Sequence, residues 1–216
     1  MSDNDYAYLE EVLPGFTQAR TLVKEQGDRV ICLGFVGTKF DFYRFANRFR
    51  LAAAFRGMRL DGFSEETVFG YDALTRVFFT WSAFERYAEL VNDRPPFFTL
   101  FSNYPRRHIK ELAAKCRELD PKNLLCDFLV KQSLQPIHEK HLQLYRDGKD
   151  FDVLTLAASI RHIFAHGMLT AHPNKLPAEN MTMIANHLAE FLIEFVRRDF
   201  DRRLKLAVGL HDMKAT

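Results

Sequence analysis

The sequence predicts an all-α protein, a helical bundle with an N-terminal extension. Apolar side chains recur every three or four residues in most segments, as they do on one face of a helix. Start and stop signals for helices separate these segments. The chain shows no convincing alternation of apolar and polar residues, no repeat of fixed period and no low-complexity tract. A helical bundle is therefore the expected architecture.

Length and composition narrow the class of protein further. The chain has 216 residues, 47% of them hydrophobic, and a net charge of +2, which fits one domain with a substantial core. No run approaches the roughly 18 apolar residues of a membrane span, and the first residues, MSDNDYAYLEE, are acidic. We therefore expect a cytoplasmic protein without membrane attachment. Three cysteines lacking C-x-x-C spacing indicate neither a disulfide framework nor a thiolate zinc site.

Residues 1–65 form the expected N-terminal extension. Residues 4–25 predict a helix, whereas the apolar run at 29–37 leaves a short strand and a buried turn equally open. The segment that follows, 40–60, is the most basic of the chain and carries phenylalanines at helical spacing. Its arginines would follow an RNA backbone while the phenylalanines pack inward, although a solvated basic helix explains the same pattern. The candidate RNA-binding residues are Arg44, Arg48 and Arg50.

Residues 66–206 form the expected bundle, and 207–216 a C-terminal tail. A long helix from 64 or 65 to 91 begins it, and the segment NDRPPFF ends that helix. Its apolar stripe consists of Leu74, Val77, Phe78, Trp81, Phe84, Ala88 and Val91. Three shorter helices follow, and Gly148 suits the end of the third. Their start signals are Asn103 with Pro105, Asp120 with Pro121, and Pro136.

The last two helices enclose a polar loop. Asp150 or Asp152 caps the first of them, DFDVLTLAASIRHIFAH, and Gly167 stops it. The final helix covers about 178–206. Its buried seam is expected to consist of Ile184, Leu188, Phe191 and Phe195.

The end of the penultimate helix carries the candidate catalytic residues, Arg161 and His166. On an ideal helix they lie about 140° apart and about 7.5 Å along the axis, so they do not share a face. However, His166 lies where the helix ends, and the long Arg161 side chain reaches toward the same end. The negative end of the helix dipole also stabilises a protonated imidazole there. An arginine for phosphate oxygens beside such a histidine is the minimum equipment for RNA cleavage without metal.

On the motif IRHIFAHG, with helices before it and a closing helix after it, the chain resembles the HEPN superfamily, whose bundles carry an R-x4-6-H motif. The resemblance implies a HEPN-like bundle and a metal-independent endoribonuclease, a hydrolase that uses no cofactor. It also implies a homodimer with a composite Arg/His cleft, acting on single-stranded RNA in toxin–antitoxin or antiviral defence systems, with an antitoxin or regulatory protein as partner. His162 departs from the pattern because many members have a polar amide residue there, and Met168 stands where one branch has a tyrosine.

A further carboxylate, Glu85, is a candidate supporting residue. It falls inside the apolar stripe of its helix, where an unpaired charge is costly. Arg161 is a candidate partner, which would make Glu85 an orienting residue, with His162 as a second supporting residue. A different cation or exposure at the edge of the stripe is the alternative for Glu85.

Other interpretations of these residues stay open. The chain would also fit a non-catalytic HEPN-like module that binds RNA, a nucleotide or a partner protein, or a helical protein in which Arg161 and His166 are merely structural. His162 and His166 have the i, i+4 spacing of zinc ligands, but no glutamate lies between them to act as a base. His138 and His141 predict a solvated helix face.

Overall fold

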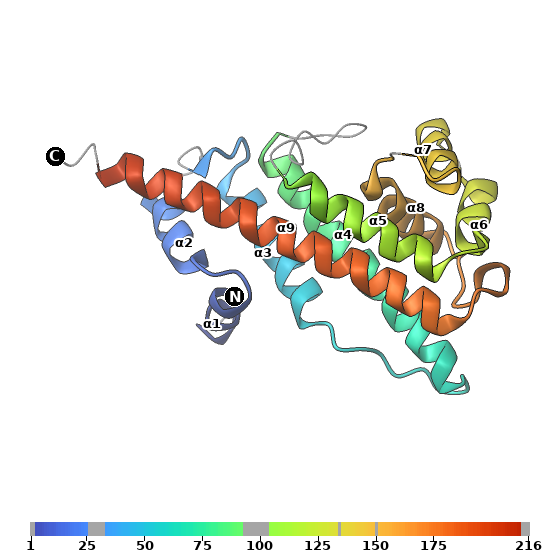
Figure 1. The fold of residues 1–216 in the computed structure, drawn as a ribbon. Coiled ribbons are helices and arrows are strands. Elements are labelled where there is room, and N and C mark those ends of the chain that lie inside the picture. The colour runs from blue at the N-terminus through green and yellow to red at the C-terminus, as the bar shows by residue number, and fades with distance from the viewer. Residues whose placement is uncertain (1–2, 26–32, 93–103, 134, 150, 213–216) are drawn as a thin grey trace. The chain divides into compact units, whose positions relative to one another are not determined.

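The protein is represented by a computed structural model, which describes residues 3–25, 33–92, 104–133, 135–149 and 151–212 (Figure 1). These residues form α-helices and one short 3-10 helix, η3, and no β-strand, so the prediction of an all-α bundle is confirmed. None of the described helices is long and apolar enough to cross a membrane. The elements are α1 (Asp3–Val12), α2 (Phe16–Glu25), α3 (Lys39–Ala54), α4 (Glu65–Leu90), α5 (Arg106–Leu119), α6 (Leu124–Gln132), α7 (Pro136–Arg146), α8 (Val153–Ala165), η3 (Pro173–Lys175) and α9 (Ala178–Asp212).

The backbone packs into two compact units. The first combines 1–54, 82–102 and 192–216, and the second combines 55–81 and 103–191. The sequence ranges of α4 and α9 contribute to both units. Each unit is described by itself below.

The first unit begins with two helices where the sequence predicted one. Pro14 has no N–H to continue a helix, and Gly15 has a left-handed φ of +83°, so α1 ends before them and α2 starts after them. The Glu10 carboxylate accepts the N–H groups of Gly15 at 2.8 Å and Thr17 at 2.7 Å. The prediction of one continuous helix over 4–25 is therefore wrong. Part of the 29–37 run lies outside the described residues.

Aromatic packing forms the core of the first unit. The predicted inward face of the basic segment is confirmed, because Phe42, Phe45 and Phe49 of α3 are fully buried. Phe42 stacks on Phe16 of α2 with ring centroids 5.4 Å apart, and Phe45 lies 5.1 Å from the ring of Tyr87 in α4. The face of α3 that carries the phenylalanines is thus used for packing.

A partly buried polar network joins α4 to α9 within this unit. The Tyr87 hydroxyl donates to Asp199 at 2.8 Å, and Arg203 donates to the same carboxylate at 2.7 Å. Burial raises the pKa of Asp199, but hydrogen bonds from Arg203, Arg202 and Tyr87 outweigh it, so the pKa lies below its ordinary value. These arginines of α9 are therefore engaged in structure.

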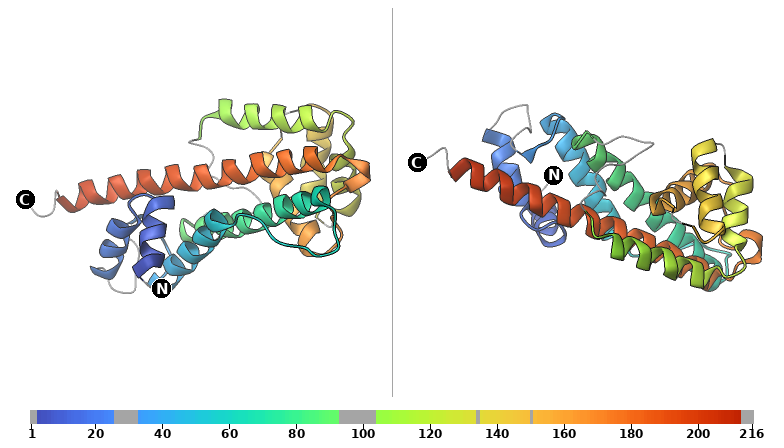
Figure 2. Two further views of the ribbon diagram at one scale, coloured as in Figure 1. Left: turned by 90° about the horizontal axis from the view of Figure 1, so that it is seen from below. Right: turned by 45° about the horizontal axis from the view of Figure 1, so that its top comes forward.

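The second unit is built around α8. Helices α6, α7 and α8 lie side by side in every view, and α5 also packs against α8 (Figures 1 and 2). Every residue from 153 to 160 is buried, as in a helix that is apolar on all sides and lies inside its unit. The side chain of Asp152 caps this helix by accepting the N–H of Leu154 at 2.9 Å, whereas Asp150 lies outside the described residues.

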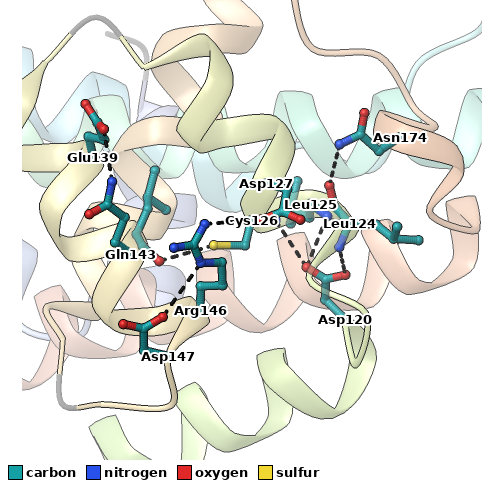
Figure 3. Close-up of polar contacts among 11 residues, drawn as sticks. Asp120, Leu124, Leu125, Cys126, Asp127, Glu139, Gln143, Arg146, Asp147 and Asn174 are labelled. Atoms are coloured by element: carbon teal, nitrogen blue, oxygen red, sulfur yellow. Dashed lines mark hydrogen bonds and ion pairs between the residues drawn. The ribbon is translucent and has the colours of Figure 1, made fainter.

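Helix α6 starts at a carboxylate placed four residues before it. Asp120 accepts the N–H groups of Leu124 at 2.6 Å, Leu125 at 3.0 Å and Cys126 at 3.2 Å (Figure 3). The N-cap position itself is Asn123, with a left-handed φ of 55°. Asp120 thus stabilises the helix start as expected from the sequence, but the helix begins later than the Asp–Pro pair indicated. Of the other predicted start signals, Pro136 opens α7, and Asn103 lies outside the described residues.

Candidate functional site at the end of α8

Most of α8 lies in the interior of the second unit, and polar side chains of its last turn lie at the surface. After the buried stretch ending at Ile160, Arg161 and His162 are half-buried, and the residues from 165 to 167 are exposed. A helix that is apolar along most of its length therefore ends in a polar, solvent-accessible turn.

Gly167 ends the helix, as predicted. Its φ of +72° is one that glycine adopts at low cost. The N–H of Gly167 donates to the carbonyl of Phe164 at 2.9 Å, and the N–H of Met168 donates to that of Ile163 at 3.1 Å. These two bonds form a Schellman motif, with His166 as the C-cap residue. The backbone of His166 is thus fixed at the point where the helix stops.

Two imidazoles and a guanidinium gather at this helix end, and we refer to Arg161, His162 and His166 as the helix-end cluster. The rings of His162 and His166 meet edge to face, with centroids 4.6 Å apart. Burial, followed by the charges of His166 and Arg161, lowers the pKa of His162. The lowered pKa favours the neutral form of His162.

Arg161 packs on an aromatic ring of α4. Its Cζ atom lies 5.9 Å from the ring centroid of Phe78, within the distance at which a cation is attracted to an aromatic face. Phe78 was predicted as part of the buried stripe of α4, and it is half-buried. The ring thus lies next to the guanidinium group of Arg161, a contact that the spacing of residues along the chain does not predict. The convergence of Arg161 and His166 on one ligand stays a prediction.

Sequence reasoning missed a third imidazole, His138 of α7. It is half-buried, and burial, followed by the charges of His162 and His141, lowers its pKa. The backbone N–H of Asp152 donates to Nδ1 of His141 at 3.3 Å. The solvated face predicted for these two histidines is therefore wrong.

The sequence did contain a signal for this. His138 and His141 precede the buried Leu142 and Tyr145 at helical spacing, so all four lie on the side of α7 that faces the interior. Because α7 packs against α8, this face brings His138 within electrostatic reach of the helix-end cluster.

The other predicted site residues belong to the first unit. Glu85 is half-buried in α4, and its pairing with Arg161 of the second unit stays a prediction. In α3, Arg44 is exposed and lies 3.4 Å from Asp41, Arg48 is exposed, and Arg50 is half-buried. RNA binding by these three arginines also stays a prediction.

The cluster offers proton transfer and anion binding. A neutral imidazole accepts a proton, and a protonated imidazole donates one. A guanidinium binds two phosphate oxygens in a bidentate geometry. Among the described residues, no group of three or more histidine, cysteine or acidic side chains is placed to hold a metal ion. The chain matches no protein-family model, no curated protein and no solved structure with which it was compared. The chemistry of the helix-end cluster is therefore the basis for a function.

Proposed function

We propose that the protein is a metal-independent endoribonuclease of HEPN type, acting as a homodimer, with the helix-end cluster as half of a composite site. The observation that supports this most is the proximity of two imidazoles and one guanidinium to one another at an exposed helix end stopped by glycine. Arg161 would bind the phosphate, and His166, the exposed imidazole, would transfer protons.

The proposed reaction needs one proton acceptor and one donor. An imidazole takes the proton of a ribose 2′-hydroxyl, the 2′-oxygen bonds to the adjacent phosphorus, and the bond from phosphorus to the 5′-oxygen breaks. A second imidazole gives a proton to the leaving 5′-oxygen. The products are a 2′,3′-cyclic phosphate and a 5′-hydroxyl, and no water is consumed in this step. Arg161 stabilises the charge that builds on the phosphate oxygens.

A second copy of the chain would supply the second His166 and the second Arg161 to the same cleft. His162 has a supporting role in each copy. The ring centroids of His162 and His166 lie 4.6 Å apart, and burial together with the charges of its neighbours lowers the pKa of His162. The lowered pKa favours a neutral His162 beside His166, which would transfer the protons.

The test is cleavage of single-stranded RNA by the purified protein in excess chelator. We expect fragments that end in 2′,3′-cyclic phosphate and 5′-hydroxyl groups. Arg161→Ala is expected to lower the cleavage rate by about 100-fold or more, the range found when a group that stabilises transition-state charge is removed. Arg59→Ala is the matched control, because Arg59 is highly exposed and lies outside the cluster. Circular dichroism checks that both variants fold.

Two outcomes would contradict the proposal. One is cleavage that requires a divalent metal, and the other is cleavage that survives Arg161→Ala. Salt-sensitive RNA binding without any cleavage product would instead favour the non-catalytic RNA-binding module.

A further inference from the structure

A pocket of about 350 Å³ opens in the second unit, and the proposed reaction does not use it. Three segments that are distant in the sequence line it: the residues after α3, the first half of α4 and the first turns of α9. Its wall combines two arginines, one carboxylate, one amide, one hydroxyl and two phenylalanine rings. Such a mixture of charged, polar and aromatic groups is typical of a site that orients a small ligand.

Three of the polar side chains on the helices of the pocket, Asp72, Arg76 and Asn186, are held in place by hydrogen bonds. Nη1 of Arg76 donates to Oδ1 of Asn186 at 2.8 Å, which joins α4 to α9 across the pocket wall. The Asp72 carboxylate, one turn before Arg76, accepts the N–H of Met58 at 2.7 Å. Gly57 has a φ of +128°, and a Cβ atom there would lie 2.9 Å from Oδ2 of Asp72. The loop therefore approaches Asp72 closely, which the glycine allows.

One buried hydroxyl in the wall has no partner within the described part of the chain. Oγ1 of Thr182, in α9, is inaccessible to solvent and makes no hydrogen bond there. A buried polar atom without a hydrogen bond is costly. Thr182 is one of the residues that line the pocket.

Two phenylalanine rings form the aromatic part of the wall. Phe69 is 59% exposed although it lies on a helix that packs in the unit, and Phe55 is half-buried. Phe55 is supported by the edge of Phe79, with ring centroids 5.4 Å apart. Exposed aromatic faces beside arginines are the arrangement on which proteins stack unpaired bases.

We propose that this pocket binds a single nucleotide. The base would stack on Phe69, its edge would hydrogen-bond to Asp72 and Asn186, and the phosphate would lie against Arg56 and Arg76. An aromatic carboxylate would also suit the arginines and the rings, but it would leave Asp72 facing an anion. A base amino group, in contrast, is the donor that a carboxylate accepts. At about 350 Å³ the pocket lies near the lower limit of ligand sites, a size that fits one nucleotide.

The nucleotide has two possible sources, a free nucleoside monophosphate or one unit of an RNA strand. The inference goes beyond the proposed function and does not depend on Arg161 or His166, which do not line the pocket. Binding of free nucleotides would therefore be observed even if the chain cleaves no RNA.

Calorimetric titration of the full chain with each of the four nucleoside 5′-monophosphates tests the first source. We expect saturable binding of at least one of them, weakened tenfold or more by Phe69→Ala and by Arg56→Ala. Both residues are exposed, so the substitutions leave the core intact. The matched controls are Phe63→Ala and Arg59→Ala, because Phe63 is 55% exposed and neither residue lines the pocket.

Titration with a short single-stranded RNA tests the second source, in a chain that also carries His166→Ala to prevent cleavage. If only the RNA binds, and Phe69→Ala and Arg56→Ala weaken it tenfold while the controls do not, the pocket takes a nucleotide of a strand. If neither ligand binds, or if neither pocket substitution weakens binding, the inference is overturned. Cleavage by the unsubstituted protein is measured in parallel, so that failure of the pocket and failure of the ribonuclease proposal are distinguished.

Discussion

At the scale of single residues, two carboxylates and one glycine determine where α6 begins and where α8 begins and ends. Asp120 satisfies three N–H groups at the start of α6, Asp152 caps α8, and Gly167 closes it. The first four N–H groups of a helix have no partner inside it, so a carboxylate at that position replaces lost backbone bonds. Each of these residues is a local signal that is visible in the sequence.

Asp120→Ala tests how much this capping contributes to the free energy of unfolding. The substitution leaves the N–H groups of Leu124, Leu125 and Cys126 without their acceptor, so we expect a loss of about 2 kcal/mol in the free energy of unfolding, the upper end of the range for a helix cap. Urea denaturation measures it. Asp127→Ala is the control in the same helix, since its carboxylate lies 3.9 Å from Arg146 at the surface and is expected to contribute less than about 1 kcal/mol (Figure 3). Equal losses in the two variants would contradict the capping role.

At the scale of elements, close packing in the second unit depends on a buried glycine in α4. A Cβ atom at Gly70 would lie 2.5 Å from Cβ and 3.1 Å from Cα of Ala171, a buried residue of the loop after α8. Real Cβ atoms do not approach other atoms so closely, so the segment after α8 lies against α4 only because residue 70 has no side chain.

In Gly70→Ala, the higher helix propensity of alanine stabilises the helix, whereas the close contact with Ala171 destabilises the packing. Alanine is favoured over glycine in a helix by about 1 kcal/mol, but overpacking costs about 1–3 kcal/mol, so we expect a net loss of stability. Gly209→Ala in α9 is the matched control. Among the described residues, and apart from its chain neighbours and its own helix backbone, no atom lies within 4 Å of the Cβ position at residue 209, so stability is expected to rise by up to about 1 kcal/mol. Thermal and urea unfolding of both variants measure the effect, and a gain for Gly70→Ala would show that the contact with Ala171 is not tight.

The packing of α7 on α8 predicts a dependence of stability on pH. Burial and neighbouring positive charges lower the pKa of His138 and of His162 below the ordinary value of 6.5. As the pH falls through that value the unfolded chain takes up protons before the folded chain does, so the free energy of unfolding decreases. Above it both histidines are neutral in both states and contribute no such dependence.

Urea unfolding at pH 7.5 and at pH 5.5 tests this linkage. We expect the unsubstituted protein to lose stability at the lower pH, and His138→Gln to lose less, because one of the affected imidazoles is gone. His172→Gln replaces an exposed histidine of the loop after α8 and is expected to behave like the unsubstituted protein. A His138→Gln variant with an undiminished loss would show that this imidazole is not coupled to the cluster.

At the scale of the whole molecule, the sequence predicts helices better than it predicts which side chains meet. The bounds of α4 and the stop at Gly167 follow from local patterns, namely an apolar stripe and a glycine at a helix end. The break at Pro14 and Gly15 also has a local signal in the sequence, a residue without an N–H followed by a glycine, but helical periodicity continues on both sides of it. Local chemistry therefore accounts for most of the fold.

The contacts around the site could not be predicted in the same way. Phe78 beneath Arg161, and His138 beside His162, come from different helices, and no spacing along the chain specifies that they meet. The pocket was even less predictable, because the residues of its wall range from 55 to 186 in the sequence. Such contacts depend on tertiary packing, which one sequence read by periodicity does not determine.

The central claim is that an imidazole at the end of α8 performs metal-free RNA cleavage. The most direct measurement compares the cleavage rates of the unsubstituted protein, His166→Ala and His172→Ala on one single-stranded RNA in excess chelator. We expect His166→Ala to lower the rate by about 10²- to 10⁴-fold, the usual contribution of proton transfer, whereas His172→Ala leaves it unchanged. Equal rates for the unsubstituted protein and His166→Ala, or no cleavage by any of the three, would contradict it.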